Sequence, residues 1–191
     1  MNGLEGLASL ATAACVVLAV HRSLWQFPLG AVGTALYFFV FLEANLYSSA
    51  ILQVFFFLVQ AYGWWFWLRG DGGKRPPIRR TSGRLLALGC ATAIAVAILL
   101  SILLDAFTEA EVALPDAVIF ALSVVAQLLL DRKRLENWPI WIVVNLLSII
   151  VYSSQGLWLT VFLYVFLFFN AFWGWREWLS EYRRSERTAG A

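Results

Sequence analysis

Side-chain amides inside long apolar segments are the groups of this sequence best suited to bind a small polar molecule. An amide within a membrane span needs a hydrogen-bond partner, because lipid offers none. That partner is either a neighbouring helix or a ligand, and for each amide both roles stay open. The amides are Gln53, Gln60, Gln127, Asn145 and Asn170.

Aromatic rings accompany these amides at helical spacing. Steps of seven and four residues place Gln53, Gln60 and Trp64 on one helix face, and Trp67 follows one turn later. Such a face could stack on a planar heterocycle, hydrogen-bond its polar groups and accommodate positive charge through cation–π attraction. Tryptophans also anchor helices at the membrane interface, so that role stays open for the indoles near span ends.

The composition requires these segments to lie in a membrane. Of the 191 residues, 61% are hydrophobic and 14% are charged, against about 25% charged in an ordinary soluble domain. We expect one polytopic membrane domain over residues 1–191, and no nucleic-acid partner because the net charge is only +2. Cys15, Cys90 and His21 have no metal-ligand spacing, so the sequence predicts no metal site and no cofactor.

Seven runs come near the length that crosses a hydrocarbon core of about 30 Å, and they contain no charged residue except Asp116 near the start of the fifth. The stretch 137–175 is too long for one span, and the polar cluster from Ser153 to Gly156 is expected to break it. The predicted fold is an all-α membrane protein with seven transmembrane helices. The expected spans are Gly6–Val20, Leu24–Leu42, Tyr47–Leu68, Leu85–Leu104, Val112–Leu130, Trp138–Tyr152 and Leu157–Trp175.

Charged residues sort by side across these spans. All 14 Lys and Arg residues fall on one side, whereas the loops of the other side hold acidic residues only. Basic residues near span ends stay cytoplasmic. We therefore expect the N-terminus outside and the C-terminus in the cytoplasm.

The chain also aligns with itself after a shift of 111 residues. Residues 27–67 match residues 138–178 without a gap, and 12 of these 41 positions are identical. The matches include Pro28 with Pro139 and Gly63 with Gly174. The repeated unit is three helices, and one extra helix lets the second unit start in the same orientation. This predicts a 3+1+3 parallel repeat, with a substrate site at the repeat interface.

The repeat divides the chain into five predicted parts. They are a first three-helix repeat at 4–68, a cytoplasmic linker at 69–84, a spacer helix at 85–104, a second repeat at 112–178 and a cytoplasmic tail at 179–191. No charged residue lies deep within a predicted span, which favours a facilitator over an ion-coupled pump.

Two segments resemble the PnuC-type nicotinamide riboside transporters. The string from Tyr47 to Phe57, followed by Tyr62-Gly-Trp-Trp-Phe-Trp67, is similar to the third helix of that family. Arg132-Lys-Arg-Leu-Glu-Asn-Trp138, with Trp141-Ile-Val-Val-Asn145, is similar to the segment that links their fifth and sixth helices. The resemblance covers nearly the whole chain.

The resemblance implies a SWEET-like fold, a homotrimer in the bacterial inner membrane, and passive uptake of nicotinamide riboside that cytoplasmic phosphorylation traps for NAD biosynthesis. The partners it implies are the vitamin and membrane lipid. By the same resemblance, the substrate-contacting residues are Gln53, Trp64, Trp67, Trp141, Asn145 and Trp178, with Tyr62, Gln127, Tyr164 and Asn170 as weaker candidates.

Three alternatives are kept beside this function. Similar architectures carry thiamine or riboflavin, and this chain lacks the longer segment that some nicotinamide riboside transporters have before the fifth helix. A membrane scaffold or sensor would dock a partner on the basic face, which topology alone explains. An enzyme is not expected, because the spans offer no nucleophile, metal cluster or acid–base pair.

Overall fold

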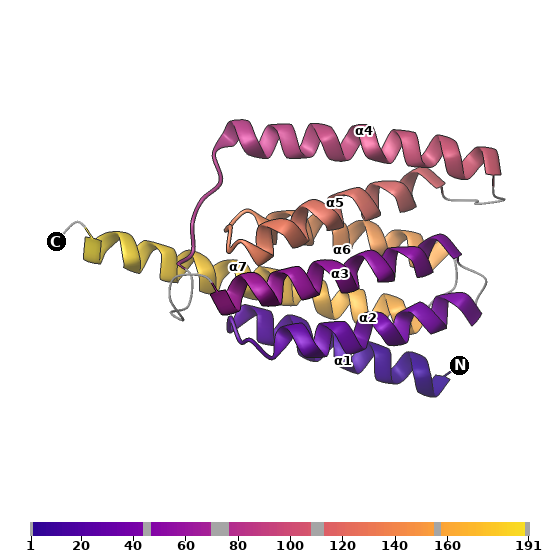
Figure 1. Cartoon of the computed structure of the whole chain (residues 1–191), viewed down its shortest axis with the longest axis horizontal. Helices are drawn as coiled ribbons and strands as arrows, with labels where there is room; N and C mark the ends of the chain where they lie inside the picture. Colours follow the sequence, from indigo (N-terminus) through magenta and orange to yellow (C-terminus); the bar gives the residue numbers. More distant parts are fainter. Residues whose placement is uncertain (1, 44–46, 70–76, 108–112, 155–157, 190–191) are drawn as a thin grey trace. The chain divides into compact units, whose positions relative to one another are not determined.

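The computed structural model describes residues 2–43, 47–69, 77–107, 113–154 and 158–189, and these residues form seven helices. The predicted all-helical class is confirmed. The helices are α1 (Asn2–Val20), α2 (Gln26–Glu43), α3 (Tyr47–Arg69), α4 (Gly83–Phe107), α5 (Ala113–Asp131), α6 (Asn137–Ser154) and α7 (Trp158–Ala189) (Figure 1). Six of them contain an apolar stretch long enough to cross a membrane. The seventh is α2, whose apolar stretch Gln26–Val40 is shorter.

The predicted break between the last two spans is confirmed, because α6 ends at Ser154 and α7 begins at Trp158. Positions 155–157, which include part of the predicted polar cluster and the first residue of the seventh expected span, lie outside the described residues. So do Val112 and positions 70–76 of the predicted linker. Pro28 and Pro139 lie in the first turns of α2 and α6, where proline costs no helical hydrogen bond.

The last helix is longer than the sequence predicts. The expected span ends at Trp175 and the predicted tail starts at 179, yet α7 continues to Ala189 and has 32 residues. At 1.5 Å per residue this is about 48 Å, more than the thickness of a hydrocarbon core. The charged end of α7 therefore extends beyond the length that a span requires.

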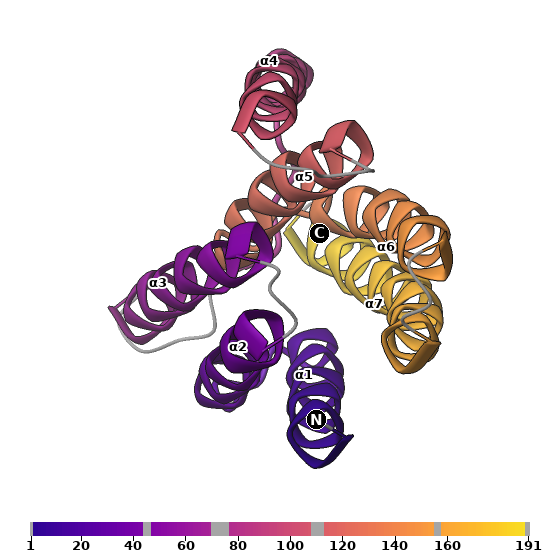
Figure 2. The same ribbon diagram turned by 90° about the vertical axis from the view of Figure 1, so that its right-hand side faces the viewer.

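The chain divides into two units, Met1–Pro77 and Ile78–Ala191. In the first unit α1 packs on α2, and α2 packs on α3. In the second unit α4 packs on α5, α5 on α6, and α6 on α7. The end-on view of Figure 2 shows this succession of neighbours within each unit. The middle helix of each triple, α2 or α6, thus contacts both of its neighbours.

Small side chains bring α4 and α5 together. Ala93 and Ala97 of α4 cluster with Ala117 and Ala121 of α5, and all four are at most 4% exposed. Most large aliphatic side chains of α4 are exposed. In lipid, helix association depends on close packing more than on the hydrophobic effect, so a stripe of small residues is a favourable contact.

The turn between α1 and α2 has the same backbone geometry as the turn between α5 and α6. Arg22 and Lys133, which are 111 residues apart, both adopt positive φ, at 52° and 51°. The backbone N–H of Arg22 donates to the carbonyl of Ala19 at 3.0 Å, and that of Lys133 donates to Leu130 at 2.9 Å.

Further hydrogen bonds repeat at the same shift. They join Ser23 to Leu18 (2.9 Å) and Arg134 to Leu129 (2.8 Å), and Gln26 to Ser23 and Asn137 to Arg134 (both 3.2 Å). The two turns share few side chains, so the match is one of backbone structure. It supports the internal repeat and extends it to residues before Phe27. The 3+1+3 arrangement itself stays a prediction.

Candidate functional site

The ten predicted site residues fall in both units. Gln53, Tyr62, Trp64 and Trp67 lie on α3 of the first unit. The second unit holds Gln127 on α5, Trp141 and Asn145 on α6, and Tyr164, Asn170 and Trp178 on α7. Their burial and contacts within each unit separate groups that pack helices from groups that could bind a ligand.

Asn145 is the amide best placed for a ligand in the second unit. It lies at the middle of the apolar span Asn137–Ser154 and is 3% exposed. Its Oδ1 is buried and makes no hydrogen bond to the residues that the structure describes. A buried acceptor without a partner costs roughly 1–3 kcal/mol, so this atom calls for a donor from elsewhere.

Trp141 lies one turn before Asn145 and is half-buried. Its indole packs against the buried cluster of Ile119, Val144 and Val151. The contact joins α5 and α6 beside Asn145 and leaves part of the ring accessible. A half-exposed ring next to a buried amide is the combination that a planar polar ligand needs.

Trp67 and Trp178 are enclosed instead. Trp67 is 5% exposed and meets Phe27 edge-on, with ring centroids 5.2 Å apart. Trp178 is 1% exposed and meets Trp138 in the same way at 5.3 Å. The two pairs occupy positions that the 111-residue shift aligns. In each pair one ring lies in the first turn of the middle helix and the other lies on the helix that follows it, which suits a structural role.

The remaining aromatic candidates differ in exposure. Tyr62 stacks on Phe66 of the same helix, with ring centroids 6.3 Å apart, and Trp64 is 41% exposed. Tyr164 packs against Tyr152 of α6 at 5.1 Å. Of the remaining amides, Asn170 is buried and Gln53 is half-buried.

Gln127 is hydrogen-bonded within its own helix. Its Nε2 donates to Oδ1 of Asp131 at 3.0 Å, one turn further along α5. Asp131 is 1% exposed and the nearby Lys133 is 0% exposed. Both lie between the expected spans that end at Leu130 and begin at Trp138, and the sequence did not predict their burial. The i, i+4 spacing of Gln127 and Asp131 was the available signal.

A short segment before α4 docks on the turn between α5 and α6. We call Ile78–Ser82 the docked segment. Its Arg79 exchanges two backbone hydrogen bonds of 3.0 Å, donating to Lys133 and accepting from Leu135. The N–H of Thr81 donates to the Glu136 carboxylate at 2.8 Å, and Arg80 lies 3.4 Å from the same carboxylate.

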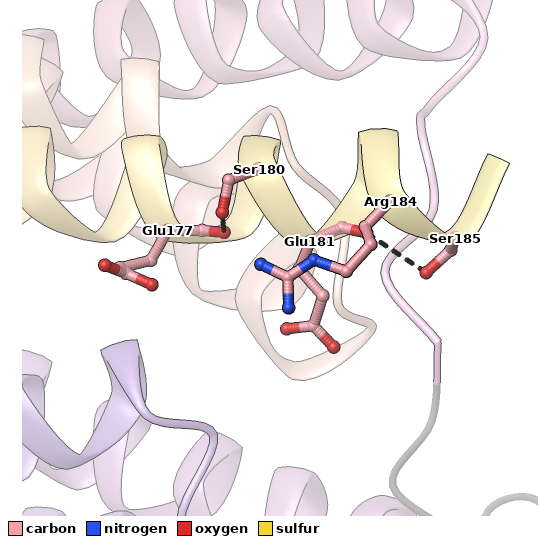
Figure 3. Close-up of a pocket in the computed structure, with 5 residues that line it drawn as sticks. All are labelled: Glu177, Ser180, Glu181, Arg184 and Ser185. Atoms are coloured by element: carbon pink, nitrogen blue, oxygen red, sulfur yellow. Dashed lines mark hydrogen bonds between the residues drawn. The ribbon is translucent and has the colours of Figure 1, made fainter. Parts of the chain in front are cut away.

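A surface depression lies at the charged end of α7. Glu177, Ser180, Glu181, Arg184 and Ser185 line it (Figure 3). The two serine hydroxyls donate to carbonyls of the same helix, at 2.8 Å and 3.1 Å. None of the ten predicted site residues lines this depression, so it is separate from the candidate site.

Comparison with known proteins agrees with these features. Residues 2–180 match the family described as nicotinamide mononucleotide transporter. The chain belongs to this family. Its resemblance to PnuC-type transporters, which two motifs indicated, is thereby confirmed, and the protein is a multi-pass membrane protein like other family members.

Two relatives of the chain are named as transporters of different molecules. The chain is 25% identical over 209 residues to the nicotinamide riboside transporter PnuC of Escherichia coli (strain K12), covering 96% of this chain and 87% of that protein. It is 30% identical over 194 residues to the riboflavin/roseoflavin transporter RibM of Streptomyces davaonensis, covering 98% of this chain and 86% of that protein.

A solved structure shares the fold. The crystal structure of the vitamin B3 transporter PnuC superposes with a TM-score of 0.78 at 23% identity, covering 95% of this chain and 82% of that chain. This likeness supports the helical architecture.

Proposed function

We propose that the protein carries nicotinamide riboside across the bacterial inner membrane by facilitated diffusion. A relative that matches 96% of the chain is named as a transporter of this molecule. The middle of α6 offers a buried amide rather than an ion-coupling charge. Uptake then follows the substrate gradient, and cytoplasmic phosphorylation of the product keeps that gradient in place.

The buried, unbonded Oδ1 of Asn145 is the observation on which this proposal chiefly rests. Substrate sites of transporters built from repeats lie near the bilayer midplane, and Asn145 is at the middle of its span with an acceptor oxygen unsatisfied within the described residues. Nicotinamide riboside has carboxamide and hydroxyl donors that could satisfy this oxygen. Trp141 would stack on its pyridinium ring, whose positive charge a ring face attracts.

The other predicted residues take graded roles in this proposal. Gln53, Tyr62, Trp64, Tyr164 and Asn170 would line the substrate's path. Trp67 and Trp178, which are enclosed in aromatic pairs, would hold the helices that bear these residues. The amide nitrogen of Gln127 is bonded to Asp131, so Gln127 would offer the substrate its amide oxygen.

Riboflavin is the second candidate substrate. A relative named as a riboflavin/roseoflavin transporter is 30% identical over 98% of the chain, a higher identity than that of the nicotinamide riboside transporter. Amides and aromatic rings suit both molecules, and they suit thiamine as well. Charge separates them, because nicotinamide riboside and thiamine are cations and riboflavin is not.

Calorimetry with purified protein tests the assignment. Nicotinamide riboside, riboflavin and thiamine are titrated side by side into the wild type and Asn145→Leu, which keeps the branching of the side chain and removes the amide. We expect nicotinamide riboside to bind, with affinity lowered about tenfold or more in the variant. Binding of riboflavin alone would transfer the function to that vitamin. Folded wild type that binds none of the three would overturn it.

The membrane arrangement is part of the proposal. We infer a homotrimer with the N-terminus outside and the C-terminus in the cytoplasm. The basic residues of 132–134 and of the end of α7 support this orientation, since basic residues remain on the cytoplasmic side.

A further inference from the structure

We infer that the Gln60 amide is a second ligand-binding group, which Gly30 positions. This inference rests on the proposed function and is argued from contacts within the first unit alone. The ligand class is a nucleoside-like vitamin whose carboxamide or ribose hydroxyl exchanges a hydrogen bond with the amide.

The depth of Gln60 in the membrane is the first argument. It lies at the middle of the apolar span Ala50–Arg69, so either end of the span is about 15 Å away along the helix. A glutamine side chain is too short to reach the polar interface from there. Its amide must find a partner inside the membrane.

The hydrogen bonding of Gln60 is the second argument. Amides of membrane helices commonly bond to a neighbouring helix. The Gln60 amide makes no such bond to any residue that the structure describes, and its side chain is only half-buried. The amide is therefore accessible as well as unsatisfied within that part of the chain, as a ligand-binding group must be.

The contact with Gly30 is the third argument. A Cβ built on Gly30 would overlap the Gln60 amide, with Cδ at 2.8 Å, and would lie 2.9 Å from Sγ of Cys15. The amide thus rests directly on the α2 backbone between two helices. Glycine is the residue that permits this approach, and the contact restricts where the amide can point.

The internal repeat supplies a fourth argument. The 111-residue shift aligns Gly30 with Trp141 and Gln60 with Ala171. The second unit therefore has a large ring on its middle helix and a buried methyl on its last helix. In the first unit the small residue, Gly30, is on the middle helix and the large one, Gln60, is on the last helix. Gln60 thus puts an amide at the position where the second unit has a methyl group. Packing alone explains the exchange of volume, but it does not explain the choice of an amide over an apolar side chain.

A substitution cycle tests the inference in the full-length protein. The variants are Gln60→Ala, Gly30→Ala and the double variant, and the measurement is calorimetric binding of nicotinamide riboside. We expect Gln60→Ala and Gly30→Ala each to raise Kd about tenfold. Because Gly30→Ala acts by displacing the amide, adding it to Gln60→Ala should change Kd by less than twofold.

Gly33→Ala is the matched control. Its Cβ would lie 2.9 Å from Oγ1 of Thr12, so it crowds α1 and α2 as closely but one turn away from Gln60. We expect it to leave Kd within twofold of the wild type. An equal loss of affinity in Gly33→Ala, or full additivity in the double variant, would show a packing effect and overturn the inference.

Ligand analogues separate a direct bond from a structural role. Nicotinamide riboside is compared with its analogue that lacks the carboxamide and with the one that lacks the 2′-hydroxyl, against wild type and Gln60→Met. The loss in Gln60→Met should disappear for one analogue, which identifies the bonded group. Equal losses for all three ligands, or wild-type affinity in Gln60→Met, would overturn the role of Gln60 alone. Failure of the wild type to bind any vitamin would instead overturn the proposed function.

Discussion

At the residue scale, Gly174 shows how closely the buried indoles are packed. A Cβ at this position would lie 2.5 to 2.7 Å from atoms of the Trp138 ring, and that ring already meets Trp178. Gly174→Ala should therefore force apart the aromatic pair that joins α6 and α7. We expect a loss of about 1–3 kcal/mol, measured as a fall in the midpoint of thermal unfolding followed by tryptophan fluorescence.

Gly89→Ala is the control for this prediction. Gly89 also lies within a helix, but the nearest atom to its added Cβ would be Cγ1 of Val125 at 3.8 Å, an ordinary contact. Alanine favours the helix over glycine, so this variant should unfold at the wild-type temperature or above it. Equal unfolding midpoints for the two variants would show that the Trp138 ring moves away from an added Cβ at position 174 without loss of stability.

The residue types of the candidate site were predictable from the sequence, but their environments were not. An amide in an apolar run is visible without a structure, as Asn145 and Gln60 are. Whether it is bonded depends on its neighbours: Gln127 reaches Asp131, whereas Oδ1 of Asn145 has no partner in the described part of the chain. The i, i+4 spacing indicates the bond of Gln127, whereas the environment of Asn145 depends on tertiary contacts that no spacing rule contains.

At the element scale, helix positions followed from charge-free runs, and the details that failed involve charges. The sequence predicted the break near Ser154 because polar residues interrupt an overlong apolar stretch. It did not predict that α7 continues to Ala189, since charged residues on an exposed helix resemble those of a tail. It also did not predict the docked segment, whose contacts depend on Glu136, a residue that reads as an ordinary loop charge.

The docked segment gives a prediction at this scale. Glu136→Ala removes the acceptor of the Thr81 N–H and the partner of Arg80. Arg80 is 65% exposed, so the ion pair itself contributes little, and the main loss is the bond to the Thr81 N–H. We expect amide hydrogen exchange in Ile78–Ser82 to become about tenfold faster, while exchange in the middle of α5 stays unchanged.

Glu186→Ala serves as the comparison, because Glu186 contacts Tyr182 on the exposed end of α7. It should leave exchange in the docked segment at the wild-type rate. If Glu136→Ala also leaves that rate unchanged, the backbone bonds between Arg79 and the turn hold the segment without the carboxylate.

At the scale of the whole molecule, the two halves share a framework but not their polar groups. The turns around Arg22 and Lys133 share the same positive-φ backbone geometry. The Phe27–Trp67 and Trp138–Trp178 pairs share the same edge-on ring contact. The amides do not coincide: Asn145 aligns with Thr34, and Gln60 aligns with Ala171. The two units therefore share backbone and aromatic features but carry their amides at different positions of the repeat.

Transport by purified protein in proteoliposomes tests the central claim most directly. Labelled nicotinamide riboside is added outside vesicles that have no ion gradient, with Asn145→Leu in parallel. We predict uptake that stops when inside and outside concentrations are equal, that unlabelled substrate inside the vesicles accelerates, and that falls about tenfold or more in the variant. Uptake that requires a proton or sodium gradient, or wild-type vesicles that admit riboflavin but not nicotinamide riboside, would contradict the account.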